Sequence, residues 1–293
     1  MNKGTLHGIA AYLIWGFFPI YFKMIEEVPP LQIVANRILW SFLLLALLLF
    51  VRQQWKVLFA SIKGPRFLLA FLIASVLLAV NWLTYVWAVN ADYIIEASLG
   101  YYINPLVSVL LGVIFLRERL RPLQWAPIGL AAFGVLFLTI SYGRLPWIAL
   151  LLAGSFGLYG LAKKTAPLGS FYGLSIETGM LIIPSLVYLT YLQTHGQGAL
   201  GHASPGIVFL LALSGPITTV PLLLFGSAAK KMDLYMLGVL QYIAPTMQFL
   251  IGVFIYGEPF THADLVGFGI IWAALALLSV EGYLVRRRRQ AFA

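Results

Sequence analysis

The sequence contains no cysteine, which excludes disulfides, thiolate metal sites and cysteine nucleophiles. It has only four histidines, and these show no metal-ligand spacing: His7, His195, His202 and His262. A phosphate loop of the form G-x-x-x-x-G-K-[ST] is also missing, so the chain has no motif for hydrolysing ATP. No nucleophile and base fall in a recognisable pattern either. We therefore expect no metal, no cofactor and no enzymatic activity.

Charge is scarce as well, at 10% of the 293 residues, whereas 61% are hydrophobic. A soluble protein of this length needs more polar surface. The apolar residues form ten blocks, each long enough at ~1.5 Å per residue to cross a ~30 Å hydrocarbon layer. The blocks cover residues 5–25, 31–51, 67–89, 94–116, 122–141, 146–163, 171–192, 206–229, 235–257 and 263–285. The sequence predicts an all-α polytopic membrane protein with ten transmembrane helices.

The basic residues lie unevenly along this pattern. If the N-terminus is placed on one side, that side receives 16 of the 19 lysines and arginines, including Arg286 to Arg289. The opposite side receives Lys23 and Arg144, and Arg37 falls within a helix. Because positive residues collect in cytoplasmic loops, both termini are predicted to be cytoplasmic. We interpret the basic tail, 286–293, as an anchor at anionic lipid, not as a nucleic-acid site.

The chain also resembles itself at an offset of 140 residues. Nine positions are identical when 102–138 is compared with 242–278, among them Pro105/Pro245 and Glu118/Glu258. The sequence therefore predicts two five-helix repeats, 1–142 and 143–285. Five crossings are an odd number, so the second repeat is inverted relative to the first. Inverted repeats around a central cavity are a common plan of secondary transporters, although a duplicated scaffold without transport activity is an alternative.

Polar and aromatic residues within the helices are the candidates for a cavity, because such groups must face protein or trapped water in a bilayer. Several share one helix face at spacings of three and four. The predicted substrate contacts are Tyr12, Trp15, Asn81, Trp82, Tyr85, Ser98, Tyr101, Asn104, Thr218, Gln241, Tyr242 and Gln248. The predicted helix bends or gates are Pro19, Pro105, Pro221 and Pro245. For any single ring, simple packing is an equal alternative.

Three acidic or basic residues are predicted to lie inside the membrane: Arg37, Glu96 and Glu177. Arg37 and Glu177 occupy matching repeat positions and so should lie at opposite depths. Glu96 is therefore the expected partner of Arg37, and Lys163 or Lys164 that of Glu177. A proton-coupling role for Glu177 is the alternative, because burial raises carboxyl pKa values.

Six segments carry a resemblance to a known family: AYLIWGFFPIYFK (11–23), NRILWSF (36–42), NWLTYVWAVN (81–90), EASLGYYINPLVSVLLGVIFLRERL (96–120), TTVPLLLFGSAAKK (218–231) and QYIAPTMQFLIGVFIYGEPF (241–260). They resemble the drug/metabolite transporter superfamily, and within it the EamA-type, RarD-like (chloramphenicol-sensitive protein) family. The resemblance implies a ten-helix carrier of the bacterial inner membrane with both termini cytoplasmic. Related members export amino acids, including aromatic ones, and other small metabolites or drugs.

These observations predict a secondary transporter that exports small metabolites, above all amino acids, by alternating access. Its partners would be a small-molecule substrate, the lipid bilayer and, as an open possibility, protons. A multidrug or antibiotic exporter of the same fold is an alternative, and a membrane scaffold or intramembrane enzyme is one from another class. Tyr101 and Asn104 are replaced by Gln241 and Ala244 in the second repeat, so we expect the unmatched residues to govern substrate choice.

Overall fold

The computed structural model describes residues 3–117, 120, 122–165, 168–229, 231 and 240–291. Throughout these ranges the regular secondary structure is helical. The helices are α1 (Lys3–Gly16), α2 (Phe18–Lys23), α3 (Pro30–Val51), α4 (Trp55–Ala60), α5 (Pro65–Asn90), α6 (Ile94–Leu116), α7 (Pro122–Tyr142), α8 (Trp147–Thr165), α9 (Ser170–Thr194), α10 (Pro205–Ala229), α12 (Ile243–Phe254) and α13 (His262–Ala291). Four of them begin at a proline, whose missing N–H costs nothing in a first turn.

Eight of the described helical segments are long and apolar enough to cross a membrane. Two shorter apolar helices accompany them, Trp147–Ala162 and Ile243–Phe254. Long apolar helices of this number make the chain a multi-pass membrane protein. The short helix α4, which the apolar pattern did not predict, lies between two of the spans.

Three predicted helices have different boundaries in the structure. The segment 5–25 is divided at Phe17 into α1 and α2, near the expected bend at Pro19. The last helix continues to Ala291, past the expected end at 285. In the segment 235–257, α12 ends at Phe254, before Gly257 with its φ of +64°. The start of that segment falls in 232–239, outside the described residues.

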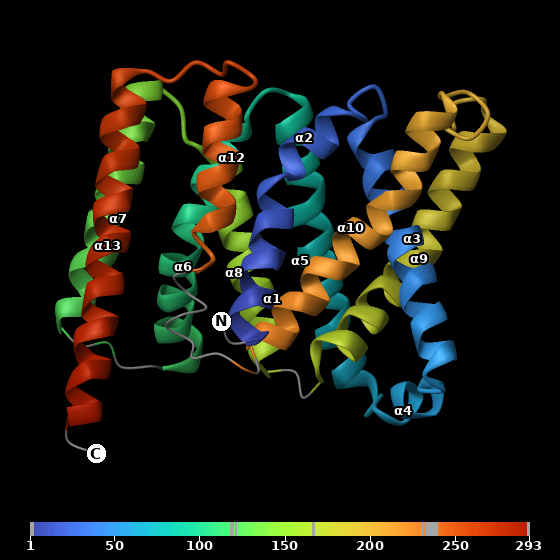
Figure 1. Cartoon of the computed structure of the whole chain (residues 1–293), viewed down its shortest axis with the longest axis horizontal. Helices are drawn as coiled ribbons and strands as arrows, with labels where there is room; N and C mark the ends of the chain where they lie inside the picture. The colour runs from blue at the N-terminus through green and yellow to red at the C-terminus, as the bar shows by residue number, and fades with distance from the viewer. Residues whose placement is uncertain are drawn as a thin grey trace.

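The helices pack as a bundle with one pair set to the side (Figure 1). α7 and α13 pack along each other at that edge. In the body of the bundle, α1 packs on α10 and α12, α8 packs on α5 and α6, and α3 packs on α9 and α10. The beginning of α1 and the end of α13 both lie on the lower side of Figure 1, as does α4. The chain therefore enters and leaves the bundle on the same side.

Candidate functional site

A cavity of about 120 Å³ lies among the central helices. Its walls come from α1, α2, α3, α5, α6, α8, α10, α12 and the residue Gln241 just before α12. The lining residues are Tyr12, Trp15, Phe18, Arg37, Leu78, Asn81, Trp82, Tyr85, Tyr101, Asn104, Phe156, Leu222, Phe225, Gln241, Ala244, Pro245 and Gln248. About half of the wall is thus aromatic, eight residues of seventeen, with a few amide and hydroxyl groups and one guanidinium. Such a mixture suits a small ligand with an apolar body and a polar head.

Nine of the twelve residues predicted to contact substrate line this cavity: Tyr12, Trp15, Asn81, Trp82, Tyr85, Tyr101, Asn104, Gln241 and Gln248. The other three lie outside its lining. Ser98 is buried and donates to the carbonyl of Ile95 at 2.7 Å. Thr218 accepts a hydrogen bond from Arg37, and Tyr242 lines a separate hollow that includes Tyr102. A role of the cavity residues in substrate contact stays a prediction.

Six lining residues were not predicted from the sequence: Phe18, Leu78, Phe156, Leu222, Phe225 and Ala244. All are apolar, so nothing in their chemistry distinguishes them from lipid-facing or packing residues. Three of them did carry a signal. Ala244 is the counterpart of Asn104 at the 140-residue offset, and Phe18 matches Phe156 when the segments 5–25 and 146–163 are compared at an offset of 138. Repeat position was therefore the available indicator.

The bend after α1 contributes a polar contact beside the cavity. Pro19 has no N–H to donate to the carbonyl of Trp15, one turn earlier. That carbonyl instead accepts a hydrogen bond from Nε2 of Gln248 at 2.9 Å. Gln248 belongs to α12, so the proline-released carbonyl joins two helices from distant parts of the chain. This satisfies the rule that a freed backbone group in a membrane must find a protein partner.

The other three predicted bend residues differ in their place along the helix and in whether they line the cavity. Pro105 and Pro221 lie in the interiors of α6 and α10, and neither lines the cavity. Pro245 lies in the first turn of α12 and does line it. A gating role for these prolines remains a prediction.

Arg37 is a cation buried beside the cavity, with 3% of its surface exposed. Its Nε donates to the hydroxyl of Thr218 at 2.5 Å. The guanidinium carbon lies 4.2 Å from the ring centre of Trp82, and at 5.4 and 5.6 Å from those of Phe18 and Phe22. Each such ring contributes about 0.5–2 kcal/mol of attraction to a desolvated cation. Three rings and one hydroxyl therefore hold the charge in place.

Asn81 has a fixed orientation at the wall of the cavity. Its Nδ2 donates to the carbonyl of Leu152 at 3.1 Å and to the hydroxyl of Ser155 at 3.0 Å. Both acceptors lie on α8 and thus hold the amide nitrogen toward that helix. The remaining oxygen, Oδ1, lies 3.4 Å from the hydroxyl of Tyr101, a long hydrogen bond. Asn81 thus links the packing of α5 on α8 to the ring of Tyr101.

Three polar atoms of the lining have no hydrogen-bond partner within the described residues: Oη of Tyr85, Oδ1 of Asn104 and Oε1 of Gln248. A buried polar atom without a partner is costly, by about 1–3 kcal/mol. All three can accept a hydrogen bond, and Tyr85 can also donate one. The cavity therefore offers acceptors to a ligand that carries N–H or O–H groups.

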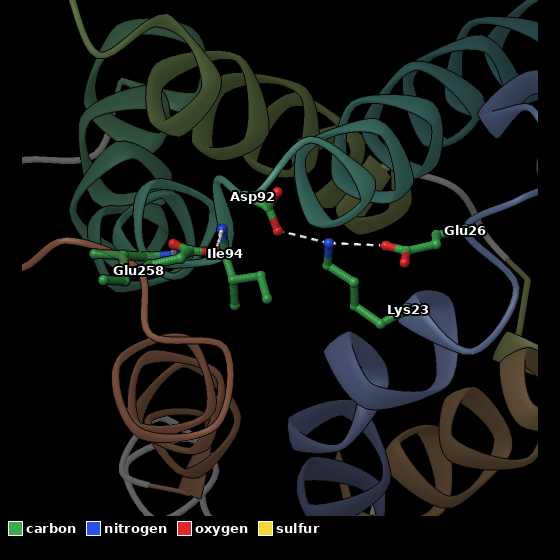
Figure 2. A network of polar contacts seen from close by, with 6 residues as sticks. Lys23, Glu26, Asp92, Ile94 and Glu258 are labelled. Atoms are coloured by element: carbon green, nitrogen blue, oxygen red, sulfur yellow. Dashed lines mark hydrogen bonds and ion pairs between the residues drawn. The ribbon is translucent and has the colours of Figure 1, made fainter.

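Contacts between charged groups tie the helices together at the upper end of the bundle. Nζ of Lys23, at the end of α2, lies 2.6 Å from Asp92 and 2.9 Å from Glu26 (Figure 2). Beside this network, the carboxylate of Glu258 accepts hydrogen bonds from the backbone N–H groups of Ile94 and Ile95, at 2.6 and 2.8 Å. Glu258 follows α12, and the two N–H groups begin α6. These contacts hold the ends of α2, α6 and α12 close together.

The expected pairing of Arg37 with Glu96 is wrong. Glu96 lies 3.4 Å from Arg144 and accepts a hydrogen bond from the backbone N–H of Ile148 at 3.1 Å. The carboxylate therefore caps the start of α8, where the unpaired N–H groups of a helix favour a negative charge. The prediction compared the depths of residues in the membrane, which does not show that Arg144 lies beside Glu96.

Glu177 is fully buried and accepts a hydrogen bond from the hydroxyl of Tyr159 at 3.0 Å. It does not line the cavity, unlike its repeat counterpart Arg37. The side chains of Lys163 and Lys164, its expected partners, lie outside the described residues. Among the residues that the structure does describe, no three His, Asp or Glu side chains form a metal-binding cluster.

Comparison with known proteins gives a consistent picture. Residues 2–140 match the model of the EamA-like transporter family. The chain is 48% identical over 281 residues to the uncharacterized transporter YojE of Bacillus subtilis, covering 95% of this chain and 94% of that protein. It is 41% identical over 287 residues to protein RarD of Escherichia coli, covering 98% and 97%. A chain of known crystal structure shares the fold with a TM-score of 0.61 and 18% identity, covering 95% of this chain and 98% of the other.

A multi-pass helical bundle with these relatives is a membrane transporter. The chain belongs to the EamA-like transporter family of the drug/metabolite transporter superfamily, and RarD proteins are among its relatives at about 40% identity.

Proposed function

We propose that this protein is a secondary transporter of the bacterial inner membrane that exports amino acids, including aromatic and apolar ones, by alternating access. The observation that carries the proposal is the central cavity, whose aromatic walls enclose three unpartnered polar atoms and one arginine. Rings accommodate an apolar side chain, while amides, hydroxyls and a cation meet the charged groups of an amino acid. A lipid-facing scaffold has no use for such a lining.

Two inverted repeats, 1–142 and 143–285, are the proposed basis of alternation. The helix contacts support this division, because exchanging the repeats maps one set onto the other. α1 packs on α10 and α12, and its counterpart α8 packs on α5 and α6. α3 with α9, α6 with α12 and α7 with α13 pack as pairs of counterparts. Ten crossings would then comprise the eight long spans and the two shorter apolar helices.

Residues that correspond between the two repeats also lie together in the lining of the cavity. Trp82 and Leu222 are separated by 140 residues, as are Tyr85 and Phe225, Tyr101 and Gln241, Asn104 and Ala244. Each of these eight residues lines the cavity. A site built from corresponding positions of two halves lies on the axis that relates them. Substrate at that place can be exposed to either side by a rocking motion of the halves.

The proposed orientation places both termini in the cytoplasm. The start of α1 and the end of α13 lie on the lower side of Figure 1, together with the basic segment 52–66 between α3 and α5. The segment that contains Arg144 joins α7 to α8 on the opposite side. Positive charge on the lower side supports assigning that side to the cytoplasm. The tied ends of α2, α6 and α12 would then lie toward the outside and would separate during export.

Purified protein in liposomes, given a panel of radiolabelled amino acids, tests the proposal directly. We expect saturable, protein-dependent exchange of aromatic or apolar amino acids. Tyr101→Ala should slow that exchange without loss of folded protein, because it removes a ring from the wall of the cavity. Protein-free liposomes are the control. Absence of protein-dependent flux for every amino acid tested would refute the proposal.

Proton coupling through Glu177 is a separable part of the proposal. The residue is buried next to Tyr159, which can stabilise either protonation state by donating or accepting a hydrogen bond. Imposing a pH gradient across the same liposomes should accelerate exchange in the unaltered protein and not in Glu177→Gln. Equal responses of the two proteins would remove Glu177 from the coupling mechanism.

A relative gives reason to include one drug in the panel. The chain is 28% identical to the chloramphenicol-sensitive protein RarD of Pseudomonas aeruginosa over 295 residues. Transport of chloramphenicol in preference to amino acids would favour a multidrug exporter of the same fold.

A further inference from the structure

The cation at the cavity lacks an acidic partner. Arg37 is 3% exposed, and no ion pair with a described carboxylate accompanies it. Its Nε is used by Thr218, which leaves the four N–H bonds of its two Nη atoms. Those atoms can bind a carboxylate through two parallel hydrogen bonds, the geometry in which guanidinium groups are strongest.

Acidic side chains near the bundle ends are already engaged elsewhere. Glu96 faces Arg144 and the N–H of Ile148, and Glu258 accepts from the N–H groups that begin α6. Neither carboxylate lines the cavity, and within the described part of its lining Arg37 is the sole charged residue. A charge buried in a membrane protein normally has a counter-ion or marks the path of an ion or substrate. The missing counter-ion of Arg37 can therefore be the substrate itself.

We propose that Arg37 binds the carboxylate of the transported molecule, so that the substrate class is small carboxylates with an apolar or aromatic body. This inference rests on the proposed transport function and specifies the chemistry of its site. Trp82 lies against the guanidinium, and Tyr85 and Tyr101, whose ring centres are 5.6 Å apart, continue the aromatic wall. The carboxylate binds Arg37 and the apolar body packs on these rings.

An α-amino group finds acceptors in the same cavity. Gln248 donates its nitrogen to the carbonyl of Trp15, so its oxygen is the atom left over for a ligand. Oδ1 of Asn104 is likewise without a partner in the described structure. An ammonium group carries only donors and therefore complements these two oxygens. The cavity thus favours an amino acid over the corresponding acid without an amino group, and requires the carboxylate in both.

Four related compounds separate the contributions of these groups: phenylalanine, phenylalanine amide, phenethylamine and 3-phenylpropanoate. We expect phenylalanine to bind the purified protein most tightly, measured by calorimetry. The amide and the amine, which lack a carboxylate, should bind at least ~10-fold more weakly, the loss typical of a charge-assisted contact. 3-Phenylpropanoate should retain part of the affinity. This comparison uses the unaltered protein and is independent of how any variant folds.

Variants of Arg37 test the assignment to the residue. Arg37→Gln should weaken phenylalanine binding by at least ~10-fold while leaving the weak binding of phenethylamine unchanged. Arg37→Lys keeps the charge but loses the paired N–H groups, so an intermediate affinity is expected. Arg52→Gln is the matched control, because it removes an exposed guanidinium that lies 5.5 Å from the ring of Phe171, outside the cavity.

The two proposals fail in different ways. If the unaltered protein moves no amino acid, the transport function is wrong. If phenylalanine and its amide bind and move equally well, transport stands and the carboxylate assignment is overturned. Selective loss of carboxylate ligands in Arg37→Gln, with normal binding in Arg52→Gln, supports the assignment. Equal weakening of all four compounds in Arg37→Gln would instead show that Arg37 only supports the packing of the cavity.

Discussion

At the crossing of α3 and α10, the two helices lie so close that Gly215 has no room for a Cβ atom. Gly215 of α10 faces the backbone of Trp40 in α3, and a Cβ atom placed on Gly215 would contact the Trp40 carbonyl carbon. The same Cβ would lie 2.6 Å from both the Cβ and the carbonyl oxygen of Trp40, whereas ordinary Cβ contacts begin at 3.4 Å. Gly215→Ala therefore requires the two helices to move apart until these contacts become ordinary ones.

This separation cannot be relieved by a change of rotamer, because the contacted atoms belong to the backbone and the Cβ of Trp40. It also affects two hydrogen bonds across the crossing. Ser41 donates to the carbonyl of Gly215 at 3.4 Å, and Arg37, one turn earlier on α3, donates to Thr218, about one turn later on α10. Overpacking of this kind typically costs about 1–3 kcal/mol of unfolding free energy. We expect the cost in this protein to lie in the same range.

Thermal unfolding in detergent, followed by tryptophan fluorescence, measures the effect. By the scale of soluble domains of 150–250 residues, roughly 2–4 °C per kcal/mol, the Tm should fall by about 2–12 °C. Gly154→Ala is the matched control, since a Cβ at that position of α8 has no neighbour within 4 Å. Its Tm should stay the same or rise, because alanine favours a helix by up to ~1 kcal/mol over glycine. Equal Tm values for the two variants would refute the account of the crossing.

Three further outcomes are expected. Gly267→Ala should destabilise the α7–α13 pair, because its Cβ would meet the side chain of Leu138. Leu138→Ala alone should also lower the Tm, since Leu138 is fully buried, but Gly267→Ala should cost less in that background, where the clashing side chain is absent. Burial raises the pKa of the Glu258 carboxyl despite the two N–H groups that favour its charge, so this group stabilises the fold below its unfolded-state pKa and loses that contribution as pH rises through the raised value. Glu258→Gln should therefore show a smaller gain in Tm on acidification than the unaltered protein, and an equal gain would contradict this linkage. Tyr101→Phe removes a hydroxyl whose one hydrogen bond among the described residues is 3.4 Å long, so the Tm should stay nearly unchanged in the same fluorescence assay. A fall as large as that of Gly215→Ala would show that this bond is stronger than its length implies.

The helices were largely predictable because a bilayer imposes both length and composition on each crossing. Apolar blocks indicated the long spans directly, and Pro19 indicated the division between α1 and α2. Boundaries were less accurate where polar residues continue a helix, as in the stretch of α13 that runs to Ala291. The helix α4 is too short for a hydropathy pattern to reveal it.

The cavity was predictable in its polar part and not in its apolar part. Asn81, Asn104 and Gln248 are unusual within membrane helices, so their chemistry marked them for a protected interior. Leu78 and Phe225 have the same character as the exposed apolar side chains of the helices, and only their neighbours in space reveal their place. The predicted partner of Glu96 was wrong for a related reason. Depth along a helix can be read from sequence, but the rotation and lateral position that join Glu96 to Arg144 cannot.

The internal repeat distinguishes two sets of residues: those shared by both repeats, which suit a common motion, and those that differ, which suit substrate selectivity. The proposed alternation between two sides would need halves of similar shape, and α6 and α12 share proline and glycine positions that would meet that need. Selectivity needs the opposite, because an amino acid has no two-fold symmetry and must be bound by unlike groups. Arg37 lines the cavity, whereas its counterpart Glu177 lies outside it and accepts a hydrogen bond from Tyr159. If the carboxylate proposal holds, the charge in the cavity comes from one repeat alone, and the direction in which a substrate lies across the axis follows from that asymmetry.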